Sequence, residues 1–347
     1  MLMTRMNQEE ARMSRSRFGV TAGAFSALVL ALTACGGDAE GGDGESDVPD
    51  LRAEYGGEDW PEELEFVSIP SEEQVELVEQ YSALIEVFEE GLGVEINSSE
   101  VTAYAAAIEA MDAGTADIAN FGPFSYVVAA DTAGAQPVAV AIDEEDEDPS
   151  YVSYLVAQSD NDEIEDIEDV EGQTVCFVDE VSTSGFLYPT AGLMEIGLEA
   201  EDDYTPHFSG AHDNSVLAVM DGTCDAAFAY DSMVDEQMVR TGDIAEGDVK
   251  VVWESEDIPS APFAASEHLP QDMVDAMEEL LLEYINTDWL AENGFCENPE
   301  PGEDEDNDCS RVVPTADYGY TEATDSVFDG IREVCDITEA EACDGEE

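Results

Sequence analysis

Short apolar segments alternate with segments of helical periodicity along most of the chain, and this alternation constrains the fold more than any other feature. Runs such as Leu64 to Ile69 and Pro137 to Ile142 have the length and composition of strands. The segment Gln74 to Glu90 has apolar residues at helical spacing and is followed by Gly91, which is typical of a helix end. Strands that alternate with helices indicate an α/β fold, and we predict mainly parallel sheets covered by helices.

The alternation is interrupted at the acidic loop Asp143 to Asp148 and then starts again. The apolar segment Tyr151 to Ala157 predicts a strand that leaves the first set of elements, and Ala261 to Ala265 predicts a strand that returns to it. Two lobes joined by two crossover strands enclose a cleft, which is where ligands of such proteins usually bind. We predict a first lobe over residues 62–150 and 258–337 and a second lobe over residues 151–257.

Three consecutive hydroxyl residues and a glycine, Ser182-Thr183-Ser184-Gly185, connect the apolar strand Val175 to Val178 to a predicted helix, Phe186 to Ile196. We call this stretch the hydroxyl turn. The start of a helix presents unpaired backbone N–H groups and the positive end of the helix dipole. Hydroxyl donors, free amides and a glycine that allows close approach form a site for a tetrahedral oxyanion. The alternative is a simple N-cap whose neighbouring Ser and Thr are incidental.

The chain is strongly negative, with 86 acidic residues against nine basic ones and a formal net charge of −77. Such a charge excludes nucleic acid as a partner, because every phosphate would be repelled. Disorder is one explanation of the acidity, and a solvated surface suited to very high salt is the other. We favour the second, because the acidic residues are interleaved with periodic apolar segments and 44% of the 347 residues are apolar, enough for two lobes with cores.

The N-terminus has the organisation of an export signal. Four arginines, the last of them Arg17, precede an apolar segment that ends in Leu32-Thr33-Ala34-Cys35. This last sequence resembles the lipobox of bacterial and archaeal lipoproteins, in which the cysteine becomes the lipidated first residue. We predict a signal peptide over residues 1–34, a lipid anchor at Cys35 on the outer face of the cytoplasmic membrane, and an acidic, glycine-rich linker over residues 35–61. The alternatives are a plain cleaved signal and a membrane helix, for which the apolar segment is short.

Six cysteines follow Cys35, and an even number in an exported chain favours disulfides. Cys176 and Cys224 lie in or beside predicted strands of the same lobe, whereas Cys296 and Cys309 flank an acidic insertion over residues 296–309. Zinc is the alternative, but no CxxC spacing occurs and the histidines are distant from most cysteines, so no metal site is expected. The connectivity is left open, and an acidic tail is predicted over residues 338–347. The six cysteines are Cys176, Cys224, Cys296, Cys309, Cys335 and Cys343.

Five short motifs, taken in their order and spacing, resemble those of the substrate-binding proteins of phosphonate, phosphite and phosphate ABC importers. The similarity covers roughly residues 64–334. The motifs are Thr102-Ala103-Tyr104-Ala105-Ala106, Gly114 to Pro123, Ser182-Thr183-Ser184-Gly185-Phe186, Gly210-Ala211-His212-Asp213 and Gly222 to Ala227. The resemblance implies the two-lobed type II periplasmic-binding-protein fold. It also implies a monomeric, non-enzymatic protein without cofactors that closes on a phosphorus oxyanion and delivers it to a membrane permease.

The resemblance also implies which side chains bind the ligand. The hydroxyl turn matches the family's oxyanion site, two tyrosines match ligand tyrosines on a first-lobe helix and on the crossover strand, and a histidine matches one that closes on the phosphorus oxygens. No lysine or arginine falls in these motifs, so hydroxyl and amide donors, a helix dipole and the histidine are expected to stabilise the anion. The implied ligand-binding residues are Tyr104, Tyr151, Ser182, Thr183, Ser184, His212 and Asp231.

Asp231 needs its own explanation, because a carboxylate beside a doubly charged oxyanion is repulsive. It must accept a proton from a P–OH group or pair with an amine on an aminoalkyl ligand. No second acidic residue stands immediately beside Asp231 in Tyr230-Asp231-Ser232, which favours the P–OH group. The segment Phe121-Gly122-Pro123 differs from that of several aminophosphonate binders, so the identity of the ligand is left open.

Two other functions fit parts of the sequence. Ser182 and His212 suggest a hydrolase that uses the same cleft, but the chain has no Gly-x-Ser-x-Gly elbow and no clear third catalytic residue. A ligand-sensing lobe that serves a membrane receptor is the other alternative, and the sequence does not separate it from a transport protein.

The charge yields a prediction about salt. Removal of the signal peptide leaves 84 acidic residues (86 minus Glu9 and Glu10), whose repulsion is screened only at high ionic strength. The thermal unfolding midpoint, followed by circular dichroism, should rise steeply between low and molar potassium chloride. A flat profile would show instead that the acidic side chains are compensated locally.

Overall fold

The computed structural model describes residues 48–71, 81–145, 148–297, 308–309, 312–313 and 316–344, all within the unit Ser46–Glu347. The predicted signal peptide, Cys35 and the linker up to residue 47 lie outside the described residues. So do most of the predicted acidic insertion and the last three residues of the predicted tail. In the part of the chain that is described, no helix has the length and apolarity needed to cross a membrane.

The first sheet has six strands, and the strand predicted to return from the second lobe lies within it. In spatial order the strands are β13 (Gly319–Glu322), β4 (Ala135–Ile142), β12 (Pro262–Ser266), β3 (Ile118–Asn120), β1 (Glu63–Ser68) and β2 (Glu95–Glu100). β1 pairs in parallel with β2 and with β3. β12 pairs antiparallel with β3 and β4, and β13 pairs antiparallel with β4.

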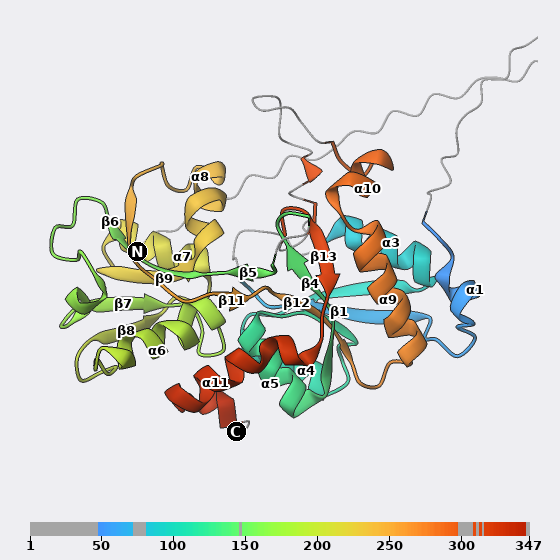
Figure 1. Ribbon diagram of the computed structural model, residues 1–347, viewed down its shortest axis with the longest axis horizontal. Helices are drawn as coiled ribbons and strands as arrows, with labels where there is room; N and C mark the ends of the chain where they lie inside the picture. The colour runs from blue at the N-terminus through green and yellow to red at the C-terminus, as the bar shows by residue number, and fades with distance from the viewer. Residues whose placement is uncertain are drawn as a thin grey trace, which may run out of the picture. The chain divides into compact units, whose positions relative to one another are not determined.

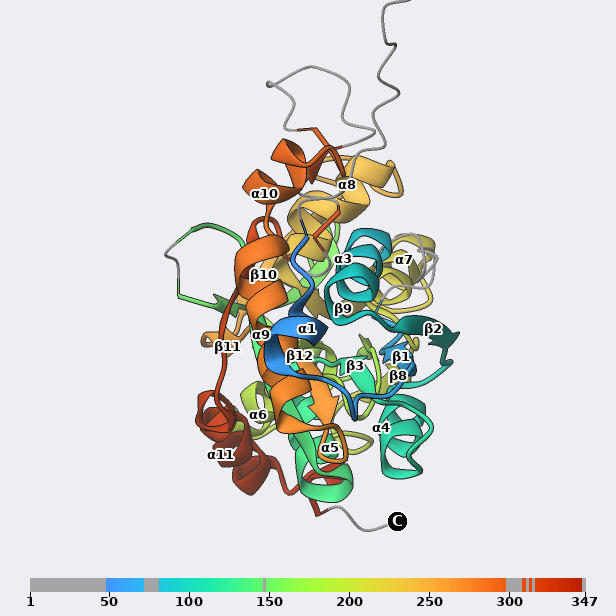
Figure 2. The same cartoon turned by 90° about the vertical axis from the view of Figure 1, so that its right-hand side faces the viewer.

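Helices cover both faces of this sheet, because successive side chains of a strand point to opposite sides. On β1, Leu64 and Phe66 belong to the core on one face and Val67 to the core on the other. The first face is covered by α1 (Leu51–Tyr55), α3 (Ser82–Leu92) and α9 (Gln271–Tyr284), which lie side by side in Figure 2. The second face is covered by α4 (Tyr104–Asp112) and α5 (Pro123–Ala133).

The second sheet has five strands and its own pair of apolar cores. In spatial order the strands are β10 (Val249–Glu254), β6 (Ser153–Gln158), β9 (Ala226–Tyr230), β7 (Thr174–Phe177) and β8 (Thr205–Phe208). One face packs against α6 (Tyr188–Glu195) and the other against α7 (His212–Asp221) and α8 (Met238–Thr241). β7 pairs in parallel with β8 and β9, whereas β6 pairs antiparallel with β9 and β10.

The predicted α/β architecture of two sheets is present, but both sheets are mixed rather than mainly parallel. The chain leaves the first sheet through β5 (Ser150–Tyr151) and returns through β11 (Ile258–Pro259), and these two segments pair antiparallel between the sheets (Figure 1). Each crossing leads directly into a strand, β6 or β12, without an intervening helix. Both of these strands run antiparallel to their neighbours, β6 to β9 and β10 and β12 to β3 and β4.

The C-terminal helix α11 (Asp329–Thr338) contacts helices that pack on both sheets, although the sequence analysis assigned this segment to the first lobe. It packs against α5 and also against α6. Phe328 and Ile331 lie in the apolar core on the α4 and α5 side of the first sheet, and Phe186, which precedes α6, packs against the same core. The end of the chain is therefore in position to connect the two lobes.

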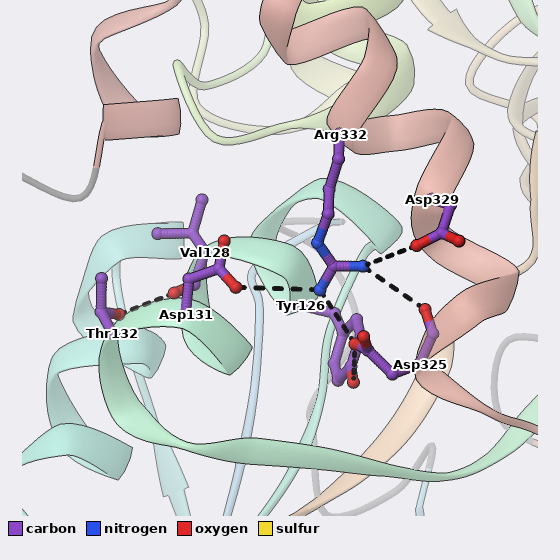
Figure 3. A network of polar contacts seen from close by, with 7 residues as sticks. All are labelled: Tyr126, Val128, Asp131, Thr132, Asp325, Asp329 and Arg332. Atoms are coloured by element: carbon purple, nitrogen blue, oxygen red, sulfur yellow. Dashed lines mark hydrogen bonds and ion pairs between the residues drawn. The ribbon is translucent and has the colours of Figure 1, made fainter.

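A cluster of charges holds α11 to α5, as Figure 3 shows. The guanidinium of Arg332 lies 2.9 Å from the carboxylate of Asp325, 3.5 Å from that of Asp329 and 3.8 Å from that of Asp131 on α5. Asp325 also accepts a hydrogen bond of 2.9 Å from the hydroxyl of Tyr126 on α5. Burial and the hydrogen bond to Asp325 raise the pKa of Tyr126, so the phenol keeps its proton and acts as a donor.

The predicted linker and tail both contribute to the folded unit. Leu51 and Trp60, assigned to the linker, are buried beside α9 because the segment contains apolar side chains among its acidic ones. In the tail, Cys343 is joined to Cys335 of α11. The other cysteines form the disulfides Cys176–Cys224 and Cys296–Cys309, the second of which closes the acidic insertion.

Candidate ligand-binding site

A cavity of about 410 Å³ lies where elements of the two sheets meet. Its walls include Asn120 and Pro123, which end and follow a strand of the first sheet, and Ser182 and His212, which follow strands of the second. All seven residues that the sequence predicted to bind a ligand line this cavity. The structure thus brings side chains from five separate segments of the chain into one place.

Four helices begin at the cavity. One of them is η2 (Thr183–Leu187), a π-helical turn that continues into α6. The first residues of the four helices all line the cavity: Tyr104 of α4, Pro123 of α5, His212 of α7 and Thr183 of η2. Ala103, Gly122 and Ala211 precede α4, α5 and α7, and none makes a side-chain capping bond. Ser, Thr, Asp or Asn usually stands at this position. These helix starts therefore bring backbone N–H groups and positive dipole ends to the cavity.

Groups from the opposite sheet bind some of these backbone amides. The N–H of Phe124, the second residue of α5, donates to Oγ1 of Thr183 at 2.8 Å. The N–H of His212 donates to the carbonyl of Ser71 at 3.0 Å. The N–H of the first residue of α4 donates to the carboxylate of Asp179, which follows β7. Three helices are thus capped across the cavity rather than by their own flanking side chains.

The hydroxyl turn is buried and closely packed. Ser182, Thr183 and Ser184 are each at most 2% exposed, and Oγ of Ser182 accepts a hydrogen bond of 3.1 Å from the N–H of Gly185. A Cβ atom added at Gly185 would lie 2.4 Å from the side chain of Val178, so only glycine fits there without displacing the turn. The surrounding strands therefore determine where the hydroxyl groups lie.

Tyr151 of β5 lies against the hydroxyl turn. Its hydroxyl forms hydrogen bonds with Ser184 and Thr183. Burial raises the pKa of Tyr151, and these two hydrogen bonds oppose that rise only in part, so the phenol is neutral and can donate. Tyr104, the first residue of α4, is 1% exposed and lines the same cavity.

His212 is buried, neutral and close to the hydroxyl turn. Its Nε2 atom lies 3.4 Å from Oγ of Ser182, and its ring packs edge-on against Tyr230 at 4.7 Å between centroids. Burial lowers the pKa of His212 to about 3, because no acidic side chain compensates the loss of hydration. A neutral imidazole binds an anion by donating a hydrogen bond rather than by its charge.

Asp231 lies in an acidic cluster that the sequence did not reveal. Burial raises the pKa of Asp231, and the charge of Asp143 adds to this rise, whereas hydrogen bonds from backbone N–H groups oppose it. Asp317 and Glu236 also line the cavity, and the N–H of Asp317 donates to the carboxylate of Asp143 at 3.0 Å. The argument that Asp231 has no acidic neighbour is therefore wrong, because its neighbours come from other segments of the chain.

One cationic side chain, Arg240, also lines the cavity, contrary to the expectation that hydroxyl groups, amides and one histidine act alone. Partial desolvation and the charges of Asp143 and Glu236 raise the pKa of Asp317 to about 6, and the charge of Arg240 opposes this rise. Arg240 stands outside every motif by which the family was recognised, at the end of α8. No sequence signal separates it from a surface arginine.

Asn120 is another cavity residue that the sequence analysis did not predict to bind the ligand. It ends β3, is 2% exposed and lines the cavity. One signal was available, because a polar residue at the carboxyl end of a central strand lies where ligands of open α/β sheets bind. Asn120 also stands inside a longer motif, Gly114 to Pro123, which indicates the family but by itself no ligand contact.

Comparison with known proteins identifies a family and several relatives. The profile of a family described as ABC transporter, phosphonate, periplasmic substrate-binding protein matches residues 66–320. The phosphate-import protein PhnD of Mycolicibacterium smegmatis is 38% identical over 330 residues, which cover 93% of this chain and 97% of that protein. The phosphonates-binding periplasmic protein of Escherichia coli is 27% identical over 228 residues, which cover 65% of this chain and 67% of that protein.

Solved structures show the same fold at lower identity. A binding-protein component of an ABC phosphonate transporter from Pseudomonas aeruginosa has a TM-score of 0.66 and 19% identity, over 81% of this chain and 87% of that chain. PhnD1 from Prochlorococcus marinus, in complex with methylphosphonate, has a TM-score of 0.64 and 20% identity, over 81% of this chain and 99% of that chain. The predicted two-lobed type II periplasmic-binding-protein fold is confirmed by these matches.

The lowered pKa of His212 predicts a pH dependence of stability. At pH values between about 3, the pKa of His212 in the folded protein, and about 6.5, the pKa of an unfolded histidine, the side chain is protonated in the unfolded chain but not in the folded protein. The contribution of neutral His212 is therefore complete above about pH 6.5 and decreases as the pH falls. Relative to His212→Gln, the free energy of unfolding of the wild type should fall by about 2 kcal/mol between pH 7 and about pH 5, since one pH unit corresponds to about 1.4 kcal/mol.

Urea unfolding at constant high salt measures this difference. His207→Gln is the matched control, because it makes the same replacement at an exposed histidine of β8, outside the cavity. A difference between the wild type and His212→Gln that stays constant with pH would show that His212 is accessible to protons in the folded protein.

Proposed function

The chain belongs to the family of periplasmic substrate-binding proteins of ABC phosphonate transporters, and on this premise we propose that it binds a phosphorus oxyanion in the cavity between its sheets and passes it to a membrane permease. Its relatives are transport proteins that bind a substrate, and the protein is likewise a substrate-binding component rather than an enzyme. The proposed ligands are phosphate, phosphite or a phosphonate.

The observation that carries this proposal is the convergence of four helix starts and three buried hydroxyl residues on one cavity. A tetrahedral oxyanion taken from water needs hydrogen bonds to replace its hydration. Backbone amides at helix starts, the hydroxyl turn, Tyr104 and Tyr151 are neutral donors of the kind that replaces it. Three helix starts without side-chain caps leave the amides to be bound by the opposite lobe or by a ligand.

The size of the cavity and its acidic cluster bear on the choice of ligand. A volume of about 410 Å³ lies in the range of pockets that hold small organic ligands, so there is room for a substituent on phosphorus. Asp231 accepts either a P–OH proton or an amine on such a substituent. The neighbouring Asp143 favours the amine more than the sequence suggested, because two carboxylates attract a cation more strongly than one.

Closure of the two lobes around the ligand is the proposed motion. It is supported by the hydrogen bonds that cap α5 and α7 across the cavity, between Phe124 and Thr183 and between His212 and Ser71. Both bonds would break if the lobes separated, which would leave the helix starts to water. The antiparallel pair β5 and β11 is the proposed hinge, because it connects the two sheets with only two residues in each strand.

Ser182 and His212 approach within 3.4 Å, which is the arrangement of a nucleophile and its base. Nδ1 of His212, however, has no partner among the described residues, so no carboxylate orients the imidazole as a triad requires. This geometry supports binding by Ser182 and His212 rather than hydrolysis.

A thermal-shift panel at high salt tests the proposal. We expect phosphate, phosphite, methylphosphonate or 2-aminoethylphosphonate to raise the unfolding midpoint, since a ligand that binds only the folded state stabilises it. Sulfate is the control for a tetrahedral anion without phosphorus. If no phosphorus oxyanion shifts the midpoint, the cavity serves another ligand.

The hydroxyl turn should carry much of the affinity. Replacing Thr183 and Ser184 together with alanine removes up to two hydrogen bonds to a charged ligand, each worth about 1.5–3 kcal/mol. The dissociation constant, measured by calorimetry with the best ligand of the panel, should therefore rise at least about 100-fold, since about 1.4 kcal/mol corresponds to a factor of ten.

Two further variants make this measurement specific. Thr183→Ser keeps the hydroxyl that accepts the N–H of Phe124 and should retain most of the affinity. Thr132→Ala removes an exposed hydroxyl of α5 that bonds only within its own helix, and it should change nothing. Unchanged affinity in a folded Thr183→Ala, Ser184→Ala double variant would place the ligand elsewhere.

Export and lipid anchoring at Cys35 complete the proposed function. The support is the sequence Leu32-Thr33-Ala34-Cys35 and the Gly-rich linker that follows it. In the native host, Cys35→Ser should move the protein from the membrane fraction to the medium, as measured by immunoblotting of both fractions. Membrane association that persists in this variant would rule out Cys35 as the anchor.

A further inference from the structure

Two buried side-chain nitrogens at the cavity, Nδ2 of Asn120 and Nδ1 of His212, have no hydrogen-bond partner among the described residues. Asn120 is 2% exposed and His212 3%; Asn120 ends a strand of the first sheet, and His212 begins α7, which packs on the second. A buried polar group without a partner costs about 1–3 kcal/mol. A ligand that accepts hydrogen bonds from these nitrogens would remove that cost.

The backbone of Asn120 is held by pairing on both sides, which fixes the position of this residue at the cavity. β3 lies between β1 and β12, and Asn120 is aligned with Ser68 on one neighbour and Phe263 on the other. Its carbonyl also accepts a hydrogen bond of 3.2 Å from the N–H of Ile69. Since Asn120 is the last residue of β3, it lies at the carboxyl end of this strand, where the cavity is.

His212, at the start of α7 beside the second sheet, supplies the matching donor. A neutral imidazole carries a single N–H, and the other ring nitrogen is an acceptor. With the proton on Nδ1, the Nε2 atom can accept the hydroxyl proton of Ser182, 3.4 Å away, while the oxygen of Ser182 still accepts the N–H of Gly185. This arrangement uses every polar atom of the pair except Nδ1–H, which is left for a ligand.

We propose that Asn120 is a further ligand-binding residue of this protein and that, together with His212, it donates hydrogen bonds to unprotonated oxygens of the bound anion. The inference rests on the proposed function. An amide nitrogen only donates, so it binds a charged P–O⁻ oxygen better than a P–OH group. Asn120 would then set the orientation of the anion, with its protonated or substituted position left to face another wall of the cavity.

Calorimetric titration at molar salt tests this assignment with phosphate, phosphite and methylphosphonate. Asn120→Ala removes one hydrogen bond to a charged ligand and should raise the dissociation constant of every anion that binds by about ten- to 100-fold. Asn120→Asp has the same shape but replaces the donor by a carboxylate, and it should raise the constant by more than about 100-fold. Asn293→Asp is the matched control, because it adds the same charge at the end of α10 (Thr287–Glu292), outside the cavity lining, and should bind as the wild type does.

The stability of the ligand-free protein separates binding from a structural role. Asn120→Ala removes a buried amide nitrogen without a partner, so the unfolding midpoint without ligand should stay the same or rise. A residue that only supports the fold would lower the midpoint when truncated, and a lowered midpoint would count against the proposal.

The outcomes also separate this inference from the function on which it rests. If the wild type binds an anion and Asn120→Ala binds it equally well, Asn120 is not a ligand residue, while the proposed function stands. If the wild type binds neither these three anions nor 2-aminoethylphosphonate, both are overturned. Weakened binding in Asn120→Ala and Asn120→Asp with wild-type binding in Asn293→Asp supports the assignment.

Discussion

The convergence of helix starts on one cavity is the constraint on which the rest of the structure depends. Buried backbone N–H groups must find partners, and the residues before α4, α5 and α7 are Ala103, Gly122 and Ala211, which supply none from their side chains. The partners come instead from the other sheet, as in the bond from Phe124 to Thr183, or are left for a ligand. The lack of side-chain caps at these helix starts therefore leads both to the hydrogen bonds between the lobes and to the proposed anion site.

The scarcity of positive charge explains why such a site suits this chain. Only nine of its residues are basic, and several of those described hold distant segments of the fold together. Arg332 joins α11 to α5, and Arg52 donates to the carbonyls of Trp60 and Gly93. A site of neutral donors selects an anion by the geometry of its oxygens as well as by its charge. Arg240 is the exception at the cavity, and four carboxylates, those of Asp143, Asp231, Glu236 and Asp317, line the same cavity.

The fold brings the two halves of the site together through very few connections. β5 and β11 are two residues long each and carry the chain between the sheets, while α11 packs against both α5 and α6. Two short crossings and one packed helix thus border the interlobe cavity, and these are the connections at which the proposed closure would take place. The network around Arg332 joins α11 to Asp131 of α5, and α11 also packs against α6, so this helix links both halves of the fold.

The sequence by itself determined the features that depend on neighbouring residues. Periodicity located strands such as β4 and helices such as α6 to within two residues, because apolar spacing along one segment decides which face is buried. The motifs contain five of the seven predicted residues now found around one cavity, because each motif is continuous in the chain; Tyr151 and Asp231 lie outside the motifs. The proposed ligand chemistry of the hydroxyl turn likewise follows from four adjacent residues.

Tertiary structure alone decided which separated segments meet. It placed β12 between β3 and β4 and so made the first sheet mixed, since the direction of a returning strand follows from the path of the chain in space. It gave Asp231 the acidic neighbour Asp143, brought Arg240 to the cavity wall and left Nδ2 of Asn120 without a partner. These are properties of pairs of residues far apart in sequence. The free energy of a buried charge or hydrogen-bond donor depends on the groups that pack beside it. The spacing of residues along the sequence does not show which groups these are.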